Sequence, residues 1–77
     1  MLFSDLDAGD VFVLRWWLDA GPTLRHYLVV RRAGMMLYVL RLEENDHKII
    51  EVDASTFDDH VTQGDVHLCQ VYKHGVP

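Results

Sequence analysis

The chain has 77 residues, a length that fits one domain near the lower limit at which a hydrophobic core alone supports folding. Hydrophobic residues make up 49% of the sequence, which excludes a disordered chain, and a single cysteine, Cys69, excludes an internal disulfide. The net charge of −5 disfavours a general nucleic-acid binder, because neutralisation of phosphates supplies most non-specific affinity.

Turn residues divide the chain into five expected strands and one short helix. The strands are predicted at residues 11–18, 23–32, 35–42, 47–53 and 66–73, because these segments are rich in β-branched, aromatic and leucine residues. In the connection 54–65, Ser55-Thr56-Phe57-Asp58 predicts a helix cap, and a helix over 55–61 could bury Phe57 and Val61. We expect a mainly β fold: a five-stranded antiparallel curled sheet or a small barrel, with one short helix between strands 4 and 5.

The N-terminal pattern Phe3-x-Asp5-Leu6-x-x-Gly9-Asp10-x-Phe12 resembles the opening of small SH3-like β-barrel proteins of bacteria and phages. This resemblance implies an SH3-like barrel as the way in which the sheet closes. It covers about ten residues and implies no functional residue. The triplet Gly9-Asp10-Val11 recurs as Gly64-Asp65-Val66, and both copies predict turn chemistry before a strand.

A period of two assigns the residues of the first three strands to two faces. The expected core face holds Phe12, Leu14, Trp16, Leu18, Leu24, Leu28, Val30, Leu37 and Val39. The expected second face holds Val13, Trp17, Tyr27, Val29, Tyr38, Leu40 and Leu42, edged by Arg15, Arg25 and Arg31. This assignment depends on a three-residue turn at 20–22 and a two-residue turn at 33–34, which set the strand registers.

The second face is apolar and aromatic, whereas a solvated sheet face should carry polar residues at alternate positions. Three covers are possible: the chain's own helix or last strand, a second copy that makes a homodimer, or a different protein. The short helix offers few apolar residues, so we favour an intermolecular cover for at least part of this face.

Metal and catalytic constellations are incomplete in the sequence. His60, His67, Cys69 and His74 include metal-ligating types but lack two tight ligand pairs, so we predict no metal site. Cys69 with His67 or His60 is the one nucleophile–base arrangement to consider, and no oxyanion loop precedes the cysteine. Since no phosphate- or dinucleotide-binding glycine pattern is present either, we predict a non-enzymatic protein without a cofactor.

The predicted partner-binding residues are Trp17, Arg15, Arg25, Tyr27, Arg31 and Tyr38, because exposed aromatic and arginine side chains are typical of interface hot spots. They indicate a protein-interaction module of a phage or accessory type that binds and inhibits a host protein complex. The alternative is a single-stranded nucleic-acid-binding small β-barrel that uses the same face, since residues 11–42 carry five arginines and one aspartate. The acidic start MLFSDLDAGD is unlike a signal peptide and no window spans a bilayer, so we expect a cytoplasmic protein of a bacterial or host cell that does not contact membrane.

Overall fold

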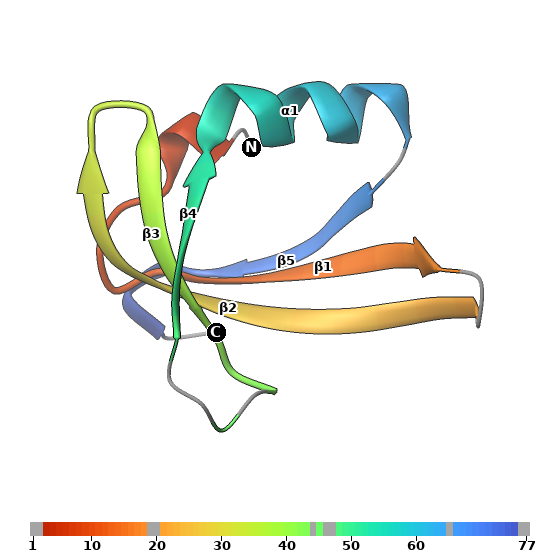
Figure 1. The fold of residues 1–77 in the computed structure, drawn as a ribbon, viewed down its shortest axis with the longest axis horizontal. Helices are drawn as coiled ribbons and strands as arrows, with labels where there is room; N and C mark the ends of the chain where they lie inside the picture. Colours follow the sequence, from red (N-terminus) through yellow and green to blue (C-terminus); the bar gives the residue numbers. More distant parts are fainter. Residues whose placement is uncertain (1–2, 19–20, 44, 46–47, 65, 76–77) are drawn as a thin grey trace.

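Five antiparallel strands form one open sheet in the order β4-β3-β2-β1-β5 (Figure 1). The computed structural model describes residues 3–18, 21–43, 45, 48–64 and 66–75. Its elements are η1 (Phe3–Asp5), β1 (Val11–Leu18), β2 (Gly21–Ala33), β3 (Met36–Arg41), β4 (Ile49–Asp53), α1 (Ala54–Gln63), β5 (Val66–Tyr72) and η2 (Lys73–Gly75). The expected mainly β fold with one helix between β4 and β5 is confirmed. The sheet is curled and does not close into a barrel.

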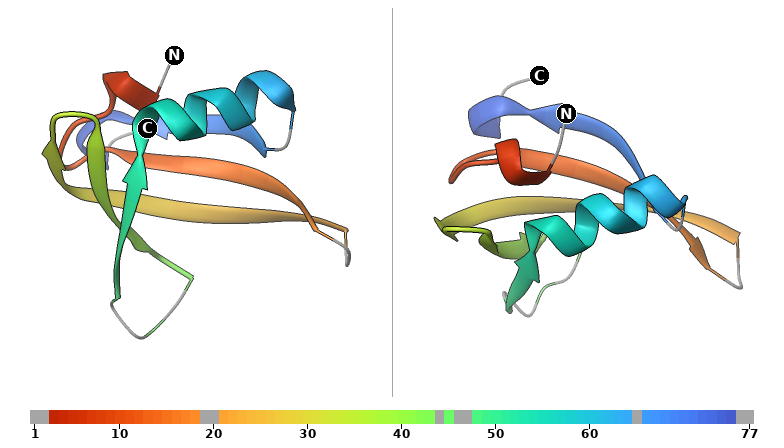
Figure 2. Two further views of the ribbon diagram at one scale, coloured as in Figure 1. Left: turned by 45° about the horizontal axis from the view of Figure 1, so that its top comes forward. Right: turned by 90° about the horizontal axis from the view of Figure 1, so that it is seen from above.

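The helix lies on one side of the sheet, which we call the inner face; the opposite side is the outer face. Figures 1 and 2 show α1 and η1 together over the inner face, while the β1–β2 hairpin extends past the end of α1. Within the described residues, no helix is long and apolar enough to cross a membrane.

The helix begins after Asp53, whose carboxylate accepts hydrogen bonds from the amides of Ser55 (2.9 Å) and Thr56 (3.3 Å). The predicted cap at 55–58 is therefore placed two residues too late. The Ser55 hydroxyl and these amides hold the pKa of Asp53 below its usual value. Gly64 ends the helix with φ of 85°, a left-handed conformation that favours glycine.

The core fills the space between α1, η1 and the inner face of the sheet. Phe57 and Val61 of α1 pack against it, as the sequence predicted. Trp16 also packs against the core, and its Nε1–H donates to the Tyr27 hydroxyl at 3.2 Å. The buried residues of this core are Phe3, Leu6, Phe12, Leu14, Tyr27, Val29, Leu37, Val39, Ala54 and Val66.

The first half of β2 shows the opposite faces from those predicted. Leu18 pairs with Gly21, so only two residues separate the two strands, whereas a three-residue turn was expected. These two residues, Asp19 and Ala20, lie outside the described residues. The observed pairing differs from the predicted one by three residues, and a shift by any odd number turns every side chain of a strand to the other face. Pro22 can lie inside this strand because β3 pairs with β2 only from Tyr27 onward, so Pro22 faces no second ladder.

A bulge at Val30 restores the predicted faces in the rest of the hairpin. Val29 pairs with Val39 but Arg31 pairs with Tyr38, so one extra β2 residue lies between the two pairs. The turn also lies one residue later than predicted, since Ala33 pairs with Met36. The shifted first half of β2 thus leaves Leu24 and Leu28 outside the core in which they were expected, and the bulge leaves Val30 outside it. Leu37 and Val39 are core residues as expected. The Leu18 side chain falls outside the described part of the structure.

A buried carboxylate ties the start of the chain to its end. Asp10 is fully enclosed and accepts hydrogen bonds from the amide of Asp7 (2.8 Å), the amide of His74 (3.0 Å) and Nζ of Lys73 (2.6 Å). Burial alone raises the pKa of Asp10, but the Lys73 hydrogen bond and the two amides outweigh it and lower that pKa. The aspartate of the first Gly-Asp-Val triplet thus bonds a nearby amide, as predicted, and also holds the C-terminal segment.

Candidate functional site

A row of apolar side chains crosses the outer face from one edge of the sheet to the other. Each member pairs directly with the next, so all of them share this face. Four members are half-buried, and the last, at the β4 edge, is 47% exposed. The row, which we call the apolar row, consists of Tyr72, Val11, Leu28, Leu40 and Ile49.

Trp17 is the largest exposed apolar side chain on this face. It lies near the end of the β1–β2 hairpin, opposite Pro22, and is 58% exposed. Because a tryptophan can bury up to about 250 Å², this exposure leaves roughly 145 Å² in contact with solvent. Leu24, also exposed, pairs with Arg15 two residues further from the hairpin turn. The hairpin therefore presents a second apolar area beside the apolar row.

Two exposed arginines lie against aromatic rings of the outer face. The Arg15 guanidinium carbon is 6.0 Å from the centroid of the Trp17 ring, and that of Arg31 is 4.2 Å from the centroid of Tyr38. Guanidinium groups on aromatic faces are oriented before a partner arrives, so less side-chain entropy is lost on binding.

The structure places four of the six predicted binding residues on the outer face and two on the inner face. Arg15, Trp17, Arg31 and Tyr38 lie on the outer face, as expected. Tyr27 is 6% exposed and stacks on Phe12 with ring centroids 5.1 Å apart, so the prediction that it offers contact area is wrong.

Arg25 also lies on the inner face, opposite Leu14, with its guanidinium carbon 5.8 Å from the centroid of Trp16. The register of β2 is the physical reason for both errors, since Tyr27 and Arg25 changed faces together.

The aromatic residues predicted to form one platform are far apart. Trp17 faces Pro22 and Tyr38 faces Arg31, which are nine residues apart along β2, or roughly 30 Å when measured along the curled strand at 3.3 Å per residue. Tyr27, which was expected to join them, is in the core. A stacking platform for successive bases needs neighbouring exposed rings, and these three side chains do not form one.

His26 lies on the outer face, opposite Val13, and it binds Glu43. Its amide donates to both carboxylate oxygens (2.7 and 3.1 Å), and Nδ1 lies 2.5 Å from Oε2. Burial alone raises the pKa of Glu43, but the His26 amide and imidazole outweigh it and lower that pKa. The pair attaches the segment after β3 to the middle of the outer face.

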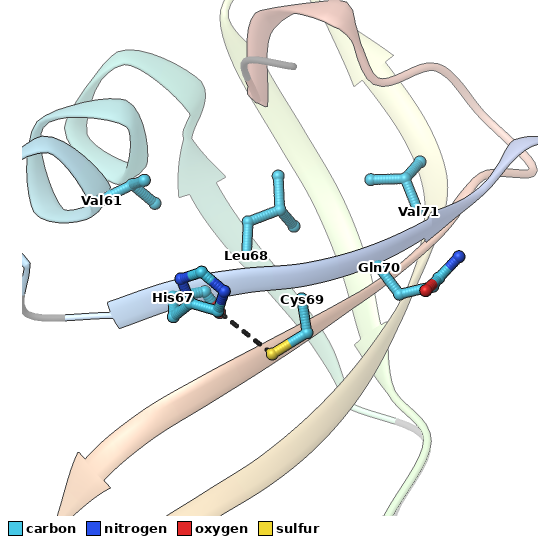
Figure 3. Close-up of a pocket in the computed structure, with 6 residues that line it drawn as sticks. All are labelled: Val61, His67, Leu68, Cys69, Gln70 and Val71. Carbon is cyan, nitrogen blue, oxygen red and sulfur yellow. Dashed lines mark hydrogen bonds between the residues drawn. The ribbon is translucent and has the colours of Figure 1, made fainter.

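The residues considered for metal or nucleophile chemistry do not assemble. Within the described ranges, no three His, Cys, Asp or Glu side chains lie close enough to hold a metal ion. The Cys69 thiol bonds to the carbonyl oxygen of His67 at 3.7 Å, rather than to an imidazole. A pocket of about 400 Å³ lies here, lined by Val61, His67, Leu68, Cys69, Gln70 and Val71 (Figure 3).

The apolar row and the Asp10 contacts were not predicted. Val11, Leu28 and Ile49 gave no signal, because the row becomes visible only when the register of all five strands is known. The Gly9-Asp10 pair did carry a signal for local turn bonds. Its contacts with Lys73 and His74 link residues more than 60 positions apart, which no local pattern shows.

No protein-family model, curated protein or solved structure matches the chain. The chemistry that the outer face can recognise is therefore inferred from its own residues: apolar area at the apolar row and the hairpin, with arginines beside Trp17 and Tyr38.

Proposed function

We propose that the protein is a non-enzymatic interaction module whose outer face binds a partner protein, with Trp17 as the anchor. The observation that carries this proposal is that Trp17 and the apolar row lie on the sheet face that α1 leaves open. Large exposed apolar patches mark interaction sites on soluble proteins. Tryptophan and arginine are the residue types that contribute most often to binding hot spots.

The charges of the outer face specify the chemistry of the partner. Arg15 and Arg31 lie along β1 and β2, and their guanidinium groups match carboxylates in geometry. We therefore propose a partner surface with an apolar centre that receives Trp17 and with acidic side chains opposite Arg15. We further propose that the protein inhibits a protein complex of its host by occupying this surface.

The experiment is quantitative affinity capture with matched variants. Wild type, Trp17→Ala and Met35→Ala are immobilised and exposed to the same host lysate. Met35 is the control because it is an exposed apolar residue (42%) in the β2–β3 turn, away from the apolar row. We expect that wild type and Met35→Ala capture equal amounts of one host protein. The amount captured by Trp17→Ala should be at least tenfold lower. The captured protein is then purified and its direct binding measured.

Two results would contradict the proposal. One is that every captured protein is retained by Trp17→Ala. The other is that the ligand is a single-stranded oligonucleotide, bound with a steep dependence on salt and lost in Arg15→Ala, which would favour the nucleic-acid alternative.

A further inference from the structure

The β5 edge of the sheet carries none of the charged residues or prolines that normally prevent strand pairing, although a bulge at Cys69 interrupts its ladder with β1. In the described part of the chain, β5 pairs with β1 on one side and has no strand on the other. From Val66 to Tyr72 it contains no lysine, no acidic residue and no proline. Natural edge strands carry such residues because an open row of backbone N–H and C=O groups recruits another strand.

The opposite edge differs from β5 in this respect. The β4 strand has five residues, and two of them, Glu51 and Asp53, are acidic. A second strand beside β4 would meet the charge of Glu51, while the Asp53 carboxylate is bound to the amides at the start of α1. The charge of Glu51 therefore disfavours an added strand at β4, and β5 carries no such charge.

The pocket at β5 runs along this open edge. Five of its six lining residues are consecutive in β5 and include side chains from both faces of the strand, so the groove follows the edge itself. Figure 3 shows Val61, Leu68 and Val71 on one side of the strand, with Cys69 and Gln70 on the other. The side chains of an added strand would complete the inner layer against Val61, Leu68 and Val71.

We propose that this edge pairs with β5 of a second copy of the chain, antiparallel, with Leu68 of each copy opposite Val71 of the other. In this register His67 lies opposite Tyr72 and Cys69 opposite Gln70, while Val66 lies beyond the paired segment. The pairing is isologous, so each contact occurs twice about a two-fold axis. It joins the two sheets edge to edge, with both α1 helices on the same side.

The β5 bulge is what makes this register self-complementary. Leu14 pairs with Leu68 but Val13 pairs with Gln70, so Cys69 is an extra residue that shifts the alternation of faces. Leu68 and Val71 therefore both point inward although they are three residues apart. Their pairing places apolar groups against apolar groups in each pocket. A register centred on Cys69 would instead place inward Leu68 opposite outward Gln70.

Charge also favours a second copy as the occupant. Since β5 is uncharged between Val66 and Tyr72, two copies meet with no like charges opposed, although each chain carries a net charge of −5. The outer faces remain exposed in this dimer. The dimer and the proposed function are therefore independent, and either can fail without the other.

The test is sedimentation velocity across concentrations from about 1 μM to about 1 mM. We expect the mass to rise with concentration from 8.9 kDa to twice that value. Gln70→Lys should raise the dimer dissociation constant at least tenfold, because it places two lysines side by side at the two-fold axis. Gln63→Lys is the matched control, since Gln63 is also exposed but lies at the end of α1.

A disulfide trap reports on the register. When Cys69 lies opposite Gln70 of the other copy, the two Cys69 residues are diagonal neighbours across the strand pair. A strand spacing of ~4.8 Å and a rise of ~3.4 Å per residue then place their Cα atoms about 6 Å apart, a distance that a disulfide can span. Diamide, which accepts the two protons and two electrons released by the thiols, should link wild type and Gln63→Lys but not Gln70→Lys. A monomer at every concentration, or a dimer equally stable in Gln70→Lys, would overturn the proposal.

Discussion

Replacement of Asp10 by alanine should destabilise the fold more than its position in a surface turn would indicate. The carboxylate is fully enclosed and is the acceptor for the amides of Asp7 and His74. It also binds Nζ of Lys73, so one side chain joins the segment before β1 to the segment after β5. Alanine removes all three contacts at once and leaves the donors in place.

The magnitude follows from the two amides that lose their acceptor. A partly buried N–H without a partner costs about 1–1.5 kcal/mol, so the two together cost about 2–3 kcal/mol. We count nothing for the Lys73 ammonium, because water can reach it once the carboxylate is gone. A domain of this size has a free energy of unfolding of roughly 4–12 kcal/mol, at about 0.05–0.15 kcal/mol per residue. The loss is therefore a large fraction of the total.

Urea unfolding of wild type and Asp10→Ala, followed by tryptophan fluorescence, measures this loss as a shift of the midpoint at constant slope. Asp7→Asn is the control, because the Asp7 side chain is exposed and lies 3.9 Å from Arg32, a pair that contributes below about 1 kcal/mol. If Asp10→Ala unfolds within about 0.5 kcal/mol of wild type, the enclosed carboxylate does not hold the two ends of the chain together.

Three further predictions concern pH, the two tryptophans and the core tyrosine. Because the pKa of Asp10 is lowered in the folded state, its contribution is complete above the unfolded pKa of about 3.9 and is lost as the pH falls through the lower folded pKa. The difference in unfolding free energy between wild type and Asp10→Asn should therefore shrink below pH ~4; an unchanged difference in stronger acid would contradict this. Trp16→Ala should destabilise by about 2–4 kcal/mol and Trp17→Ala by less than about 0.5 kcal/mol in urea unfolding, and the reverse order would refute the assigned faces. Tyr27→Phe should cost about 0.5–1.5 kcal/mol by removing the hydroxyl that accepts from Trp16, and a neutral result in the same assay would count against that bond.

The strands and their composition were predictable because they depend on local signals. The segment 11–18 matches β1, and each of the other four strands was found with ends shifted by one or two residues. His47, the predicted start of the fourth strand, lies outside the described residues. Composition, turn residues and a period of two specify where strands occur, since these properties act over a few neighbouring positions.

The faces of β2 were less predictable, because they depend on one residue in a turn. The sequence Asp19-Ala20-Gly21-Pro22 allows a two- or a three-residue turn, and the choice reverses the orientation of Arg25, Tyr27 and Val29. The bulges at Val30 and Cys69 are also invisible to a strict alternation. Trp17 was assigned correctly because it precedes the turn and depends only on β1.

The proposed binding role of the outer face is tested most directly by the affinity of the captured partner for Trp17→Ala. Isothermal titration calorimetry should give a dissociation constant at least thirtyfold weaker for Trp17→Ala than for wild type, as expected for the anchor of an interface. Met35→Ala should bind like wild type. Equal dissociation constants for wild type and Trp17→Ala would show that the partner does not bind through this face.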